Sequence, residues 1–421
     1  MRVTEKASRR ALASWCLYDW ANSAFPTVIE TFIFSAFFAR AVAADVATGT
    51  EQWGYALAAA GIAVAILSPI LGAVADRGGT RKPWLLAATL LMATAAAMLW
   101  FTKPNPDYVL WALVWFALGT VAFEFGTVFY NAMLPDLVPE EKLGRLSGWG
   151  WGLGYAGGLA CLVIALFGLI RAQPFGLDAQ AAEPVRATAL LVSAWTVVFA
   201  LPLLLFTPDR KATGIAPARA VREGLAALWR TLQEARRYRN IGVFLIARMV
   251  YTDGLNTVFA FGGIYAAGTF GMATDEIILF GVALNVTAGL GAAAFAWIDD
   301  WIGPKQTILI ALVGLVAAGT ALVLVEGKTL FWILGLVLGI FFGPAQAASR
   351  SLMARLVPQG MEAEMFGLYA LTGKATAFAG PLLLGWATVA YGSQRAGMAT
   401  TLAFIALGFV LLLFVKAPKR A

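Results

Sequence analysis

The sequence GAVADRGGTRK occupies residues 72–82, at the point where a long apolar segment gives way to a basic loop. Gly72 would let a neighbouring helix approach closely, and Gly79 would permit a tight turn. The charged side chains of this segment could bridge to the end of an adjacent helix; they are Asp76, Arg77, Arg81 and Lys82. The spacing predicts a latch between helix ends. The alternative is a turn whose basic residues only set the membrane topology.

The chain around this segment has the composition of a membrane protein. It has 421 residues, of which 60% are hydrophobic and 13% are charged, whereas soluble proteins have about 25% charged residues. Apolar runs of about 20 residues, the length of a membrane-spanning helix, recur along the whole sequence. We predict an all-α membrane protein with twelve transmembrane helices, at residues 13–42, 52–75, 84–102, 108–134, 146–170, 187–207, 241–270, 274–298, 306–325, 329–354, 364–391 and 396–415.

The lysine and arginine residues predict how these helices are oriented. Of the 31, 23 lie in the two terminal tails and in the loops that follow even-numbered spans, where Arg350 is counted with the loop after span 10. The positive-inside rule therefore places both termini in the cytoplasm. The same distribution explains the net charge of +7 without nucleic-acid binding.

A polar stretch after the sixth predicted span divides the chain. We predict an N-terminal six-helix half at residues 1–207, a cytoplasmic linker at 208–240 and a C-terminal six-helix half at 241–421. An apolar stripe within the linker is surrounded by arginines, which is typical of an amphipathic helix on a membrane surface. The stripe consists of Val221, Leu225, Leu228, Trp229 and Leu232. The alternative is a flexible linker with a basic face.

Short motifs repeat in the same order in the two halves. The matching pairs are YDWAN (18–22) with YTDGLN (251–256), DRGGTR (76–81) with DWIGPK (300–305), LVP (137–139) with LVP (356–358), and Gly148 and Gly154 with Gly367 and Gly373. Four matches in one order indicate two pseudo-symmetric six-helix halves. This is an architecture of secondary transporters, whose site lies at the repeat interface near the membrane midplane.

The second copy of the latch departs from the first. It keeps an acid and a base at the matching positions, Asp300 and Lys305. However, Ala296 stands where the first copy has a glycine, and Trp301 stands where it has an arginine. We therefore expect the second latch to be the weaker of the two.

The segment at residues 72–82 resembles the signature of the major facilitator superfamily, G-x-x-x-D-R-x-G-x-R-K, at every fixed position. The resemblance implies the major facilitator fold. It also implies a cytoplasmic gate that latches the two halves together when the central cavity faces outward. Spans 1, 4, 7 and 10 would line that cavity, with span 11 at its border.

The first predicted span narrows the resemblance. YDWANSAF at residues 18–25 resembles the opening signature of the vacuole-effluxer-like (autophagy-related permease) subfamily, and residues 253–257 and 261–265 are similar to that subfamily as well. The resemblance implies efflux of neutral amino acids, as in the fungal members. A bacterial-type member would be a multi-pass protein of the bacterial inner membrane.

Polar residues inside the predicted spans are functional candidates, because an unpaired charge facing lipid is costly. Asp19 shares one helical face with Asn22 and Glu30. The candidates for binding the substrate or a proton are Asp19, Asn22, Glu30, Glu124, Asp253, Asn256, Gln346 and Lys374, with Trp20 and Tyr251 as candidates for a stacking wall. Through the repeat, Asp19 and Asp253 are expected on opposite sides of one central site.

Three of the charged candidates have alternative roles. Asp19 and Asp253 could instead accept hydrogen bonds from interrupted helical backbone near Pro26 or Gly254. Lys374 could meet a substrate carboxylate or neutralise one of the acids. Arg248 is five residues from Asp253 and points to a different face, so we expect it to meet another helix or to extend to the inner interface.

The sequence has no histidine, no phosphate-binding G-x-x-x-x-G-K-[ST] loop and no cluster typical of a metal or nucleophilic centre. We therefore predict no enzyme activity, no metal and no cofactor. Our leading hypothesis is a monomeric, lipid-embedded secondary transporter that moves a small polar or zwitterionic, amino-acid-like solute by alternating access, with proton-coupled efflux. The alternatives are an exporter of amphiphilic or lipid-like compounds on the same fold, and a membrane sensor or receptor that transports nothing.

Overall fold

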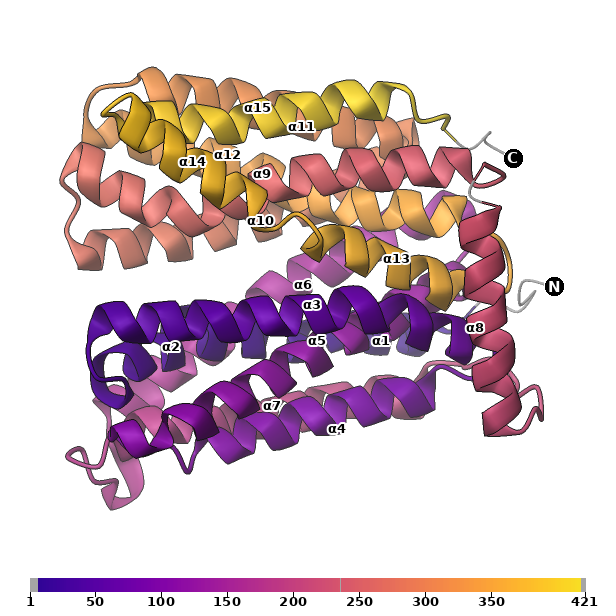
Figure 1. Cartoon of the computed structure of the whole chain (residues 1–421), viewed down its shortest axis with the longest axis horizontal. Coiled ribbons are helices and arrows are strands. Elements are labelled where there is room, and N and C mark those ends of the chain that lie inside the picture. Colours follow the sequence, from indigo (N-terminus) through magenta and orange to yellow (C-terminus); the bar gives the residue numbers. More distant parts are fainter. Residues whose placement is uncertain (1–6, 235, 418–421) are drawn as a thin grey trace.

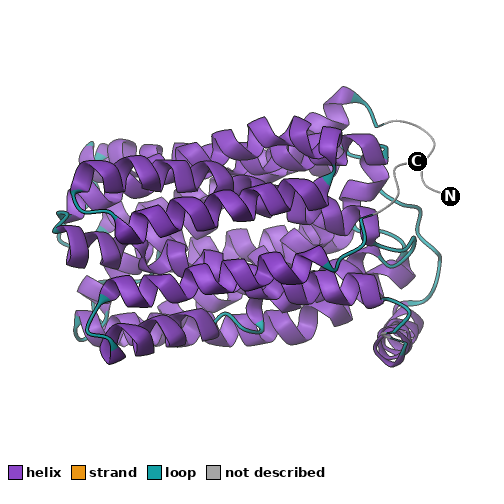
Figure 2. Ribbon diagram, turned by 90° about the horizontal axis from the view of Figure 1, so that it is seen from above, coloured by secondary structure: helices purple, strands orange, loops and turns teal. Residues whose placement is uncertain are grey.

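A computed structural model describes residues 7–234 and 236–417, and within these ranges the chain forms helices and no strands (Figures 1 and 2). Ten helical segments are long and apolar enough to cross a membrane. They are Arg9–Val42, α3 (Val46–Gly78), α4 (Lys82–Leu99), η3 (Pro106–Tyr108) with α5 (Val109–Leu137), η4 (Glu140–Lys142) with α6 (Leu143–Val163) and η5 (Ile164–Arg171), α7 (Glu183–Phe206), α10 (Thr274–Ile302), α11 (Pro304–Leu324), α12 (Lys328–Leu356) and α15 (Gln394–Leu413).

Two further segments run alongside these ten. One is α9 (Arg239–Phe270), and the other consists of α13 (Glu362–Lys374) and α14 (Ala379–Ala390), joined through turns. Figure 1 shows both lying along the bundle. The all-α membrane fold is thus confirmed, and the ten segments with these two are consistent with the twelve helices predicted from the sequence.

The first segment changes its helical winding part-way along. After α1 (Arg9–Asn22), the chain forms the π-helical η1 (Phe25–Phe32), the short α2 (Phe34–Phe37) and the π-helical η2 (Phe38–Val42). Pro26 has no backbone N–H and so cannot make the regular helical hydrogen bond. π-helical turns absorb such interruptions and occur frequently at functional sites.

The helices are arranged as two groups. In Figure 1, α2, α3, α4, α5 and α7 lie on one side, α9, α11, α12, α14 and α15 lie on the other, and α6 and α13 lie between them. We call α1–α7 the first half and α9–α15 the second half. Both described ends of the chain lie at one end of the bundle, which we call the termini end; the opposite end is the far end.

The halves approach closely along two helix pairs, α3 with α13 and α6 with α10. A Cβ atom on Gly72 would collide with the carbonyl oxygen of Ala363, and one on Gly148 would collide with the carbonyl oxygen of Ala292. Glycine at these two positions therefore allows backbone-to-backbone contact between the halves.

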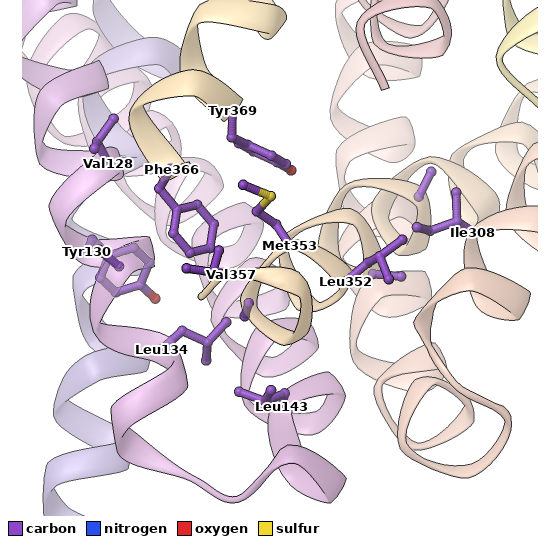
Figure 3. Packing of buried hydrophobic residues seen from close by; sticks show 14 of the residues in the cluster. Val128, Tyr130, Leu134, Leu143, Ile308, Leu352, Met353, Val357, Phe366 and Tyr369 are labelled. Carbon is purple, nitrogen blue, oxygen red and sulfur yellow. The ribbon is translucent and has the colours of Figure 1, made fainter. Parts of the chain in front are cut away.

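One hydrophobic cluster joins both halves near the termini end. It contains Tyr130 and Leu134 from α5, Leu352 and Met353 from α12, and Phe366 from α13 (Figure 3). Because these side chains are buried together, separating the halves at this end would expose the cluster. The closed termini end is therefore held by apolar packing as well as by the polar contacts described below.

The linker contains α8 (Pro217–Gln233), which lies across the termini end of the bundle (Figure 1). Its small residues pack against the end of α3, where a Cβ atom on Gly224 would collide with the backbone of Val74. Val221, Leu225 and Trp229 are exposed on α8. The amphipathic stripe of the linker is thus helical and turned away from the bundle.

Candidate functional site

A cavity of about 830 Å³ lies between the two halves. Its walls come from α1, η1, α5 and α6 of the first half and from α9, α10, α12 and α13 of the second. Toward the far end, the lining reaches the first turns of α12 and α15 at Phe331 and Met398. Toward the termini end, it stops on α1, α5 and α12 at Asp19, Asn131 and Arg350, which we call the cavity floor.

The floor is held by an ion pair between the halves. Arg350 Nη1 on α12 lies 2.9 Å from Asp19 Oδ2 on α1, and the Tyr130 hydroxyl donates to the same oxygen at 2.9 Å. Arg350 also donates to the Ser147 hydroxyl at 2.9 Å, to the Ser147 carbonyl at 2.6 Å and to the Asn131 side chain at 3.3 Å. Its side chain is only 3% exposed, against 17% for Asp19.

Three aromatic rings complete the surroundings of this arginine. The guanidinium carbon of Arg350 lies between 5.1 and 5.7 Å from the ring centroids of Trp15, Tyr130 and Trp151. All three rings belong to the first half. Arg350 therefore projects from the second half into a pocket made by the first, where cation–π contacts add to its hydrogen bonds.

A second ion pair crosses the cavity farther from the floor. Lys374 Nζ on α13 lies 2.7 Å from Glu124 Oε1 on α5. The two side chains are 28% and 15% exposed, so this pair is wetter than the floor pair. Lys374 neutralises one of the acids, which is one of the two roles expected from the sequence.

Two other charged residues line the cavity without an ion-pair partner within the described ranges. Glu30 in η1 is within electrostatic range of Lys374 and Glu124 but bonds to neither. Arg248 on α9 donates to the carbonyl oxygen of Tyr369 at 2.8 Å and lies over the ring of that tyrosine, 3.4 Å from its centroid. Arg248 thus meets another helix, as expected, and its charge is not neutralised there.

The predicted amides all line the cavity, namely Asn22, Asn256 and Gln346. Asn22 Nδ2 donates to the Thr127 hydroxyl of α5 at 3.2 Å, and its side-chain oxygen has no hydrogen-bond partner in the described part of the chain. The amides thus add neutral hydrogen-bond donors and acceptors to a lining that also contains the two ion pairs and the unpaired charges.

Three predicted site residues lie outside the cavity lining. Asp253 is 3% exposed and accepts a hydrogen bond at 3.2 Å from the N–H of Gly380, in the first turn of α14. Tyr251 is fully buried against Ser349, and Trp20 stacks on Trp195 of α7 at 5.6 Å. Asp253 thus bonds to backbone, but the partner is Gly380 of α14 and not the backbone near Gly254 that the alternative named. The two aromatic residues pack between helices.

The latch predicted at residues 72–82 closes the termini end through Arg81. This side chain is 2% exposed, and its Nη1 lies 2.7 Å from Asp136 Oδ2 on α5. Its Nη2 lies 3.0 Å from Glu362 Oε2, at the start of α13 in the second half. Arg81 therefore joins the two halves through a buried, multiply bonded guanidinium.

Asp76 makes a second contact between the halves. Its two carboxylate oxygens accept hydrogen bonds from the N–H groups of Ala363 and Glu364, at 3.1 and 2.9 Å. These groups belong to the first turn of α13, where a carboxylate complements the helix dipole. Gly72 allows the approach, because a Cβ atom there would occupy the position of the Ala363 carbonyl.

The other residues of the first latch hold its own half together. Gly79 ends α3 with φ +87°, a conformation that favours glycine. Lys82 Nζ donates to the carbonyl oxygen of Leu204 at 2.9 Å, and the carbonyl oxygen of Arg77 accepts a hydrogen bond from the Thr213 hydroxyl. These contacts attach the latch to α7 and to the linker.

The linker contributes a residue to the same closure. Arg210 lies 2.7 Å from Asp136 and 2.6 Å from Glu362, so it parallels Arg81. Burial alone would lower the pKa of Arg210, but its hydrogen bonds to Glu362 and Asp136 raise the pKa, so the guanidinium stays charged. Its neighbour Asp209 accepts hydrogen bonds from the N–H groups of Arg81 and Lys82.

The second copy of the latch also has partners across the interface. Asp300 lies 2.8 Å from Arg145 of α6, in the first half. Asp299 pairs within the second half, 2.7 Å from Arg355 of α12, and Arg355 in turn donates to the carbonyl oxygen of Glu140 in the first half. The side chain of Arg145 is 44% exposed, so its ion pair with Asp300 is screened by water. Lys305 lies apart from this interface and donates to the carbonyl oxygen of Leu413.

Several residues of these sites were not among the predicted candidates, and the charged residues Arg350, Arg210 and Glu362 are the main ones that join the two halves. Arg350 lies within the predicted tenth span, 329–354, but near its end, and was therefore counted with the basic residues of the loop that follows. In the structure it lies on α12 and inside the bundle. The spacing of Arg350 and Gln346, one helical turn apart, was the available signal. Arg210 and Glu362 follow helix ends in sequence, and nothing local to them indicates that they meet.

Comparison with known proteins identifies the family. The family model described as "Vacuole effluxer Atg22 like" matches residues 7–421. The chain belongs to this family. It is 28% identical to the MFS-type transporter YxiO of Bacillus subtilis (strain 168), over 96% of this chain and 94% of that protein. The expected membership of the vacuole-effluxer-like subfamily is thus confirmed.

Fungal proteins of this family are longer than the chain. Autophagy-related protein 22-1 of Penicillium rubens is 27% identical over 66% of this chain and 50% of its own length. The chain therefore spans about half the length of that fungal relative.

Solved structures show the same fold at low sequence identity. The major facilitator transporter FucP in its outward conformation aligns with a TM-score of 0.76 at 14% identity, covering 97% of this chain and 100% of that one. The proton:xylose symporter XylE aligns with a TM-score of 0.74 at 14% identity, covering 97% and 96%. These structures show that the chain has the major facilitator fold. Together with the family match and the MFS-type relative, this identifies a membrane transporter of that type.

Proposed function

We propose that this effluxer-family chain exports a small zwitterionic, amino-acid-like solute by alternating access, driven by an inward flow of protons. The chain belongs to a family whose model is described as vacuole effluxers. The cavity between the halves supplies a site large enough for a solute of this size, since ligand pockets of about 300–1,000 Å³ are usual. The charges of the lining supply the preference for a zwitterion.

The unpaired charges of Glu30 and Arg248 carry this proposal. The Asp19–Arg350 pair and the Glu124–Lys374 pair are each neutral. They therefore leave no net charge for a solute to balance. Glu30 and Arg248 face the same cavity with opposite charges and no ion-pair partner in the described chain. An ammonium group at Glu30 and a carboxylate at Arg248 would satisfy both, and the solute would add no net charge to a low-dielectric site.

We place the termini end in the cytoplasm, following the distribution of basic residues. The ion-paired closure at that end and the lining that reaches the far end correspond to an outward-facing state, with the far end toward the outside of a bacterial inner membrane. Efflux then requires the closure to open, the cytoplasmic solute to enter and the far end to close. No second copy of the chain is required for this cycle.

The experiment uses inverted membrane vesicles, in which export appears as uptake when the interior is acidified. A panel of zwitterionic amino acids, amines, carboxylates and amphiphiles is tested on the unaltered chain, Glu30→Gln and Arg248→Lys. We expect zwitterions to be taken up and both variants to raise KM by about tenfold or more, since about 1.4 kcal/mol corresponds to tenfold. Glu51→Gln, at an exposed acid outside the lining, is the matched control and should leave KM unchanged.

A second candidate function follows from the walls of the cavity. Aromatic and aliphatic side chains dominate the lining away from the charged groups; they include Phe32, Phe259, Leu338 and Phe342. Such walls suit the apolar part of an amphiphilic compound. Uptake of amphiphiles that is unaffected by Glu30→Gln and Arg248→Lys, with no uptake of zwitterions, would favour this function and contradict the first.

A further inference from the structure

We propose that the exposed face of the linker helix α8 binds anionic phospholipid in the membrane leaflet at the termini end. No residue of α8 (Pro217–Gln233) lines the cavity between the halves. The lipid surface is therefore separate from the proposed solute site and goes beyond the proposed function. The position of α8, its three faces and its charge each point to lipid.

α8 packs on the outer side of the bundle. Gly224 lies against α3, where a Cβ atom would be 2.9 Å from the backbone of Val74. Gly72, two residues before Val74, lies against Ala363 of α13. Two residues correspond to a rotation of about 200° around a helix of about 3.6 residues per turn, so α8 and α13 contact opposite sides of α3. Figure 2, in which α8 is seen end-on, shows it at one corner of the bundle.

The same side of α3 continues into surface that faces lipid. Val74 lies four residues before Gly78, the last residue of α3, which places α8 roughly 6 Å inside the helix end at a rise of about 1.5 Å per residue. Ile70 and Leu67 follow on this side at one and two helical turns from Val74, and Leu67 is 40% exposed. α8 is therefore level with the end of a membrane-spanning helix and beside its lipid-facing side, where lipid headgroups meet the acyl chains.

The side chains of α8 form three faces. Small residues at helical spacing face the bundle and are buried: Ala220, Gly224, Ala227 and Thr231. The next face is apolar and between 44% and 63% exposed, and it consists of Val221, Leu225, Trp229 and Leu232. The third face carries the exposed arginines Arg219, Arg222 and Arg230. A helix with these faces lies in the membrane interface, with its apolar side among acyl chains and its cations at the headgroups.

The charge of the linker favours anionic lipid over neutral lipid. Residues 211–239 contain seven lysine and arginine residues and two acids, which is an excess of five positive charges. Both acids are already paired with arginines of the linker, at 2.6 and 3.4 Å. Arg222 and Arg230 are exposed and form no ion pair within the described chain. Guanidinium groups bind phosphate oxygens, and basic residues beside a membrane attract anionic lipid.

Other occupants match this surface less well. A second copy of the chain would bring two faces with the same excess of positive charge together. An acidic protein segment would match the charge, but it would have to replace lipid beside the lipid-facing side of α3. Anionic phospholipid supplies an acyl chain for the apolar face and a phosphate for the arginines at the same level.

The experiment measures which lipid surrounds Trp229. The full-length chain is reconstituted in nanodiscs with equal amounts of phosphatidylglycerol and phosphatidylcholine, and one lipid or the other carries bromine on the upper part of its acyl chains. Bromine quenches tryptophan fluorescence at short range. The signal of Trp229 is the difference between the unaltered chain and Trp229→Phe, a variant that keeps an aromatic ring on the apolar face.

We expect brominated phosphatidylglycerol to quench Trp229 at least about twofold more than brominated phosphatidylcholine does. Arg222→Gln with Arg230→Gln should remove this excess. The control Lys103→Gln with Arg171→Gln, at exposed cations of the far end, should retain it. Salt at about 1 M should reduce the excess, because it screens exposed charges. Glycerophosphoglycerol, the headgroup without acyl chains, should not compete, because it cannot cover the apolar face.

Three results would overturn the proposal: no quenching of Trp229 by either lipid, equal quenching by both, or an excess that survives Arg222→Gln with Arg230→Gln. Light scattering in detergent tests the second copy as occupant. A dimer that Trp229→Ser converts to a monomer would assign the face to that copy and also overturn lipid binding. None of these measurements requires solute uptake, so a failure of the proposed function is distinguished from a failure of the lipid surface.

Discussion

Asp19 and Asp253 occupy matching positions in the two halves, yet their surroundings differ. Asp19 lines the cavity, pairs with Arg350 at 2.9 Å and accepts the Tyr130 hydroxyl. Asp253 lies outside the lining and bonds to the N–H of Gly380 where α14 begins. One carboxylate thus joins the halves, and the other stabilises a helix start within its own half.

Asp19 and Asp253 differ because of the residue that is available to pair with each carboxylate, and not because of the carboxylates themselves. In the register set by the two LVP motifs, the residue six positions before the motif is Arg350 in the second half and Asn131 in the first. An arginine can reach across the interface and neutralise Asp19, whereas an asparagine cannot neutralise Asp253. Asp253 instead lies at an interrupted helix, where backbone N–H groups compensate a carboxylate. A repeated sequence therefore preserves the place of a residue on its helix but not its role.

Among the substitutions that test this difference, replacing Arg350 should have the largest effect on stability. Arg350→Gln leaves Asp19 without its cation, and breaking a buried ion pair costs about 3–5 kcal/mol. We expect a clear fall in the thermal unfolding midpoint of the purified protein. The double variant Asp19→Asn with Arg350→Gln should be less destabilised than the sum of the single variants, because the two residues interact directly. Additive losses would show that the pair contributes no coupling.

Removing Asp253 should have a smaller effect, and on stability alone. Asp253→Ala takes away an acceptor at the start of α14, and loss of such a cap costs about 0.5–2 kcal/mol. We expect a modest fall in the unfolding midpoint and unchanged solute uptake by acidified inverted vesicles. Asp275→Ala, at an exposed acid of α10, controls for the loss of a negative charge. Loss of proton coupling in Asp253→Ala would restore the symmetric two-acid site expected from the repeat.

The fold was predictable from the sequence because its signals are local. The length of each apolar run predicts a membrane-spanning helix. Gly72, with Asp76 four residues later, predicts a helix end that contacts another helix. The lining of one helix face was predictable for the same reason: Asp19, Asn22 and Glu30 follow helical spacing and all line the cavity.

The partners of these residues were not predictable, because they come from distant parts of the chain. Arg350 and Asp19 are 331 positions apart, and Arg350 resembles a loop residue when judged by its distance from the end of an apolar run. Arg210 and Glu362 likewise meet only because the linker folds back over the termini end. Local patterns indicate where a charge lies along its helix, whereas its counter-ion depends on how the halves pack.

The smallest expected effect concerns Asn131, the first-half counterpart of Arg350. Asn131→Ala removes the longest of the Arg350 hydrogen bonds, at 3.3 Å, and a bond of this kind contributes about 1 kcal/mol. We therefore expect a small fall in the thermal unfolding midpoint of Asn131→Ala, and no further fall when Arg350→Gln is already present, because the amide then has no arginine to bind. Asn22→Ala, whose amide bonds within the first half to Thr127, is the control, and its effect should be the same with and without Arg350→Gln. An effect of Asn131→Ala that persists in the Arg350→Gln background would mean that this amide does not support Arg350.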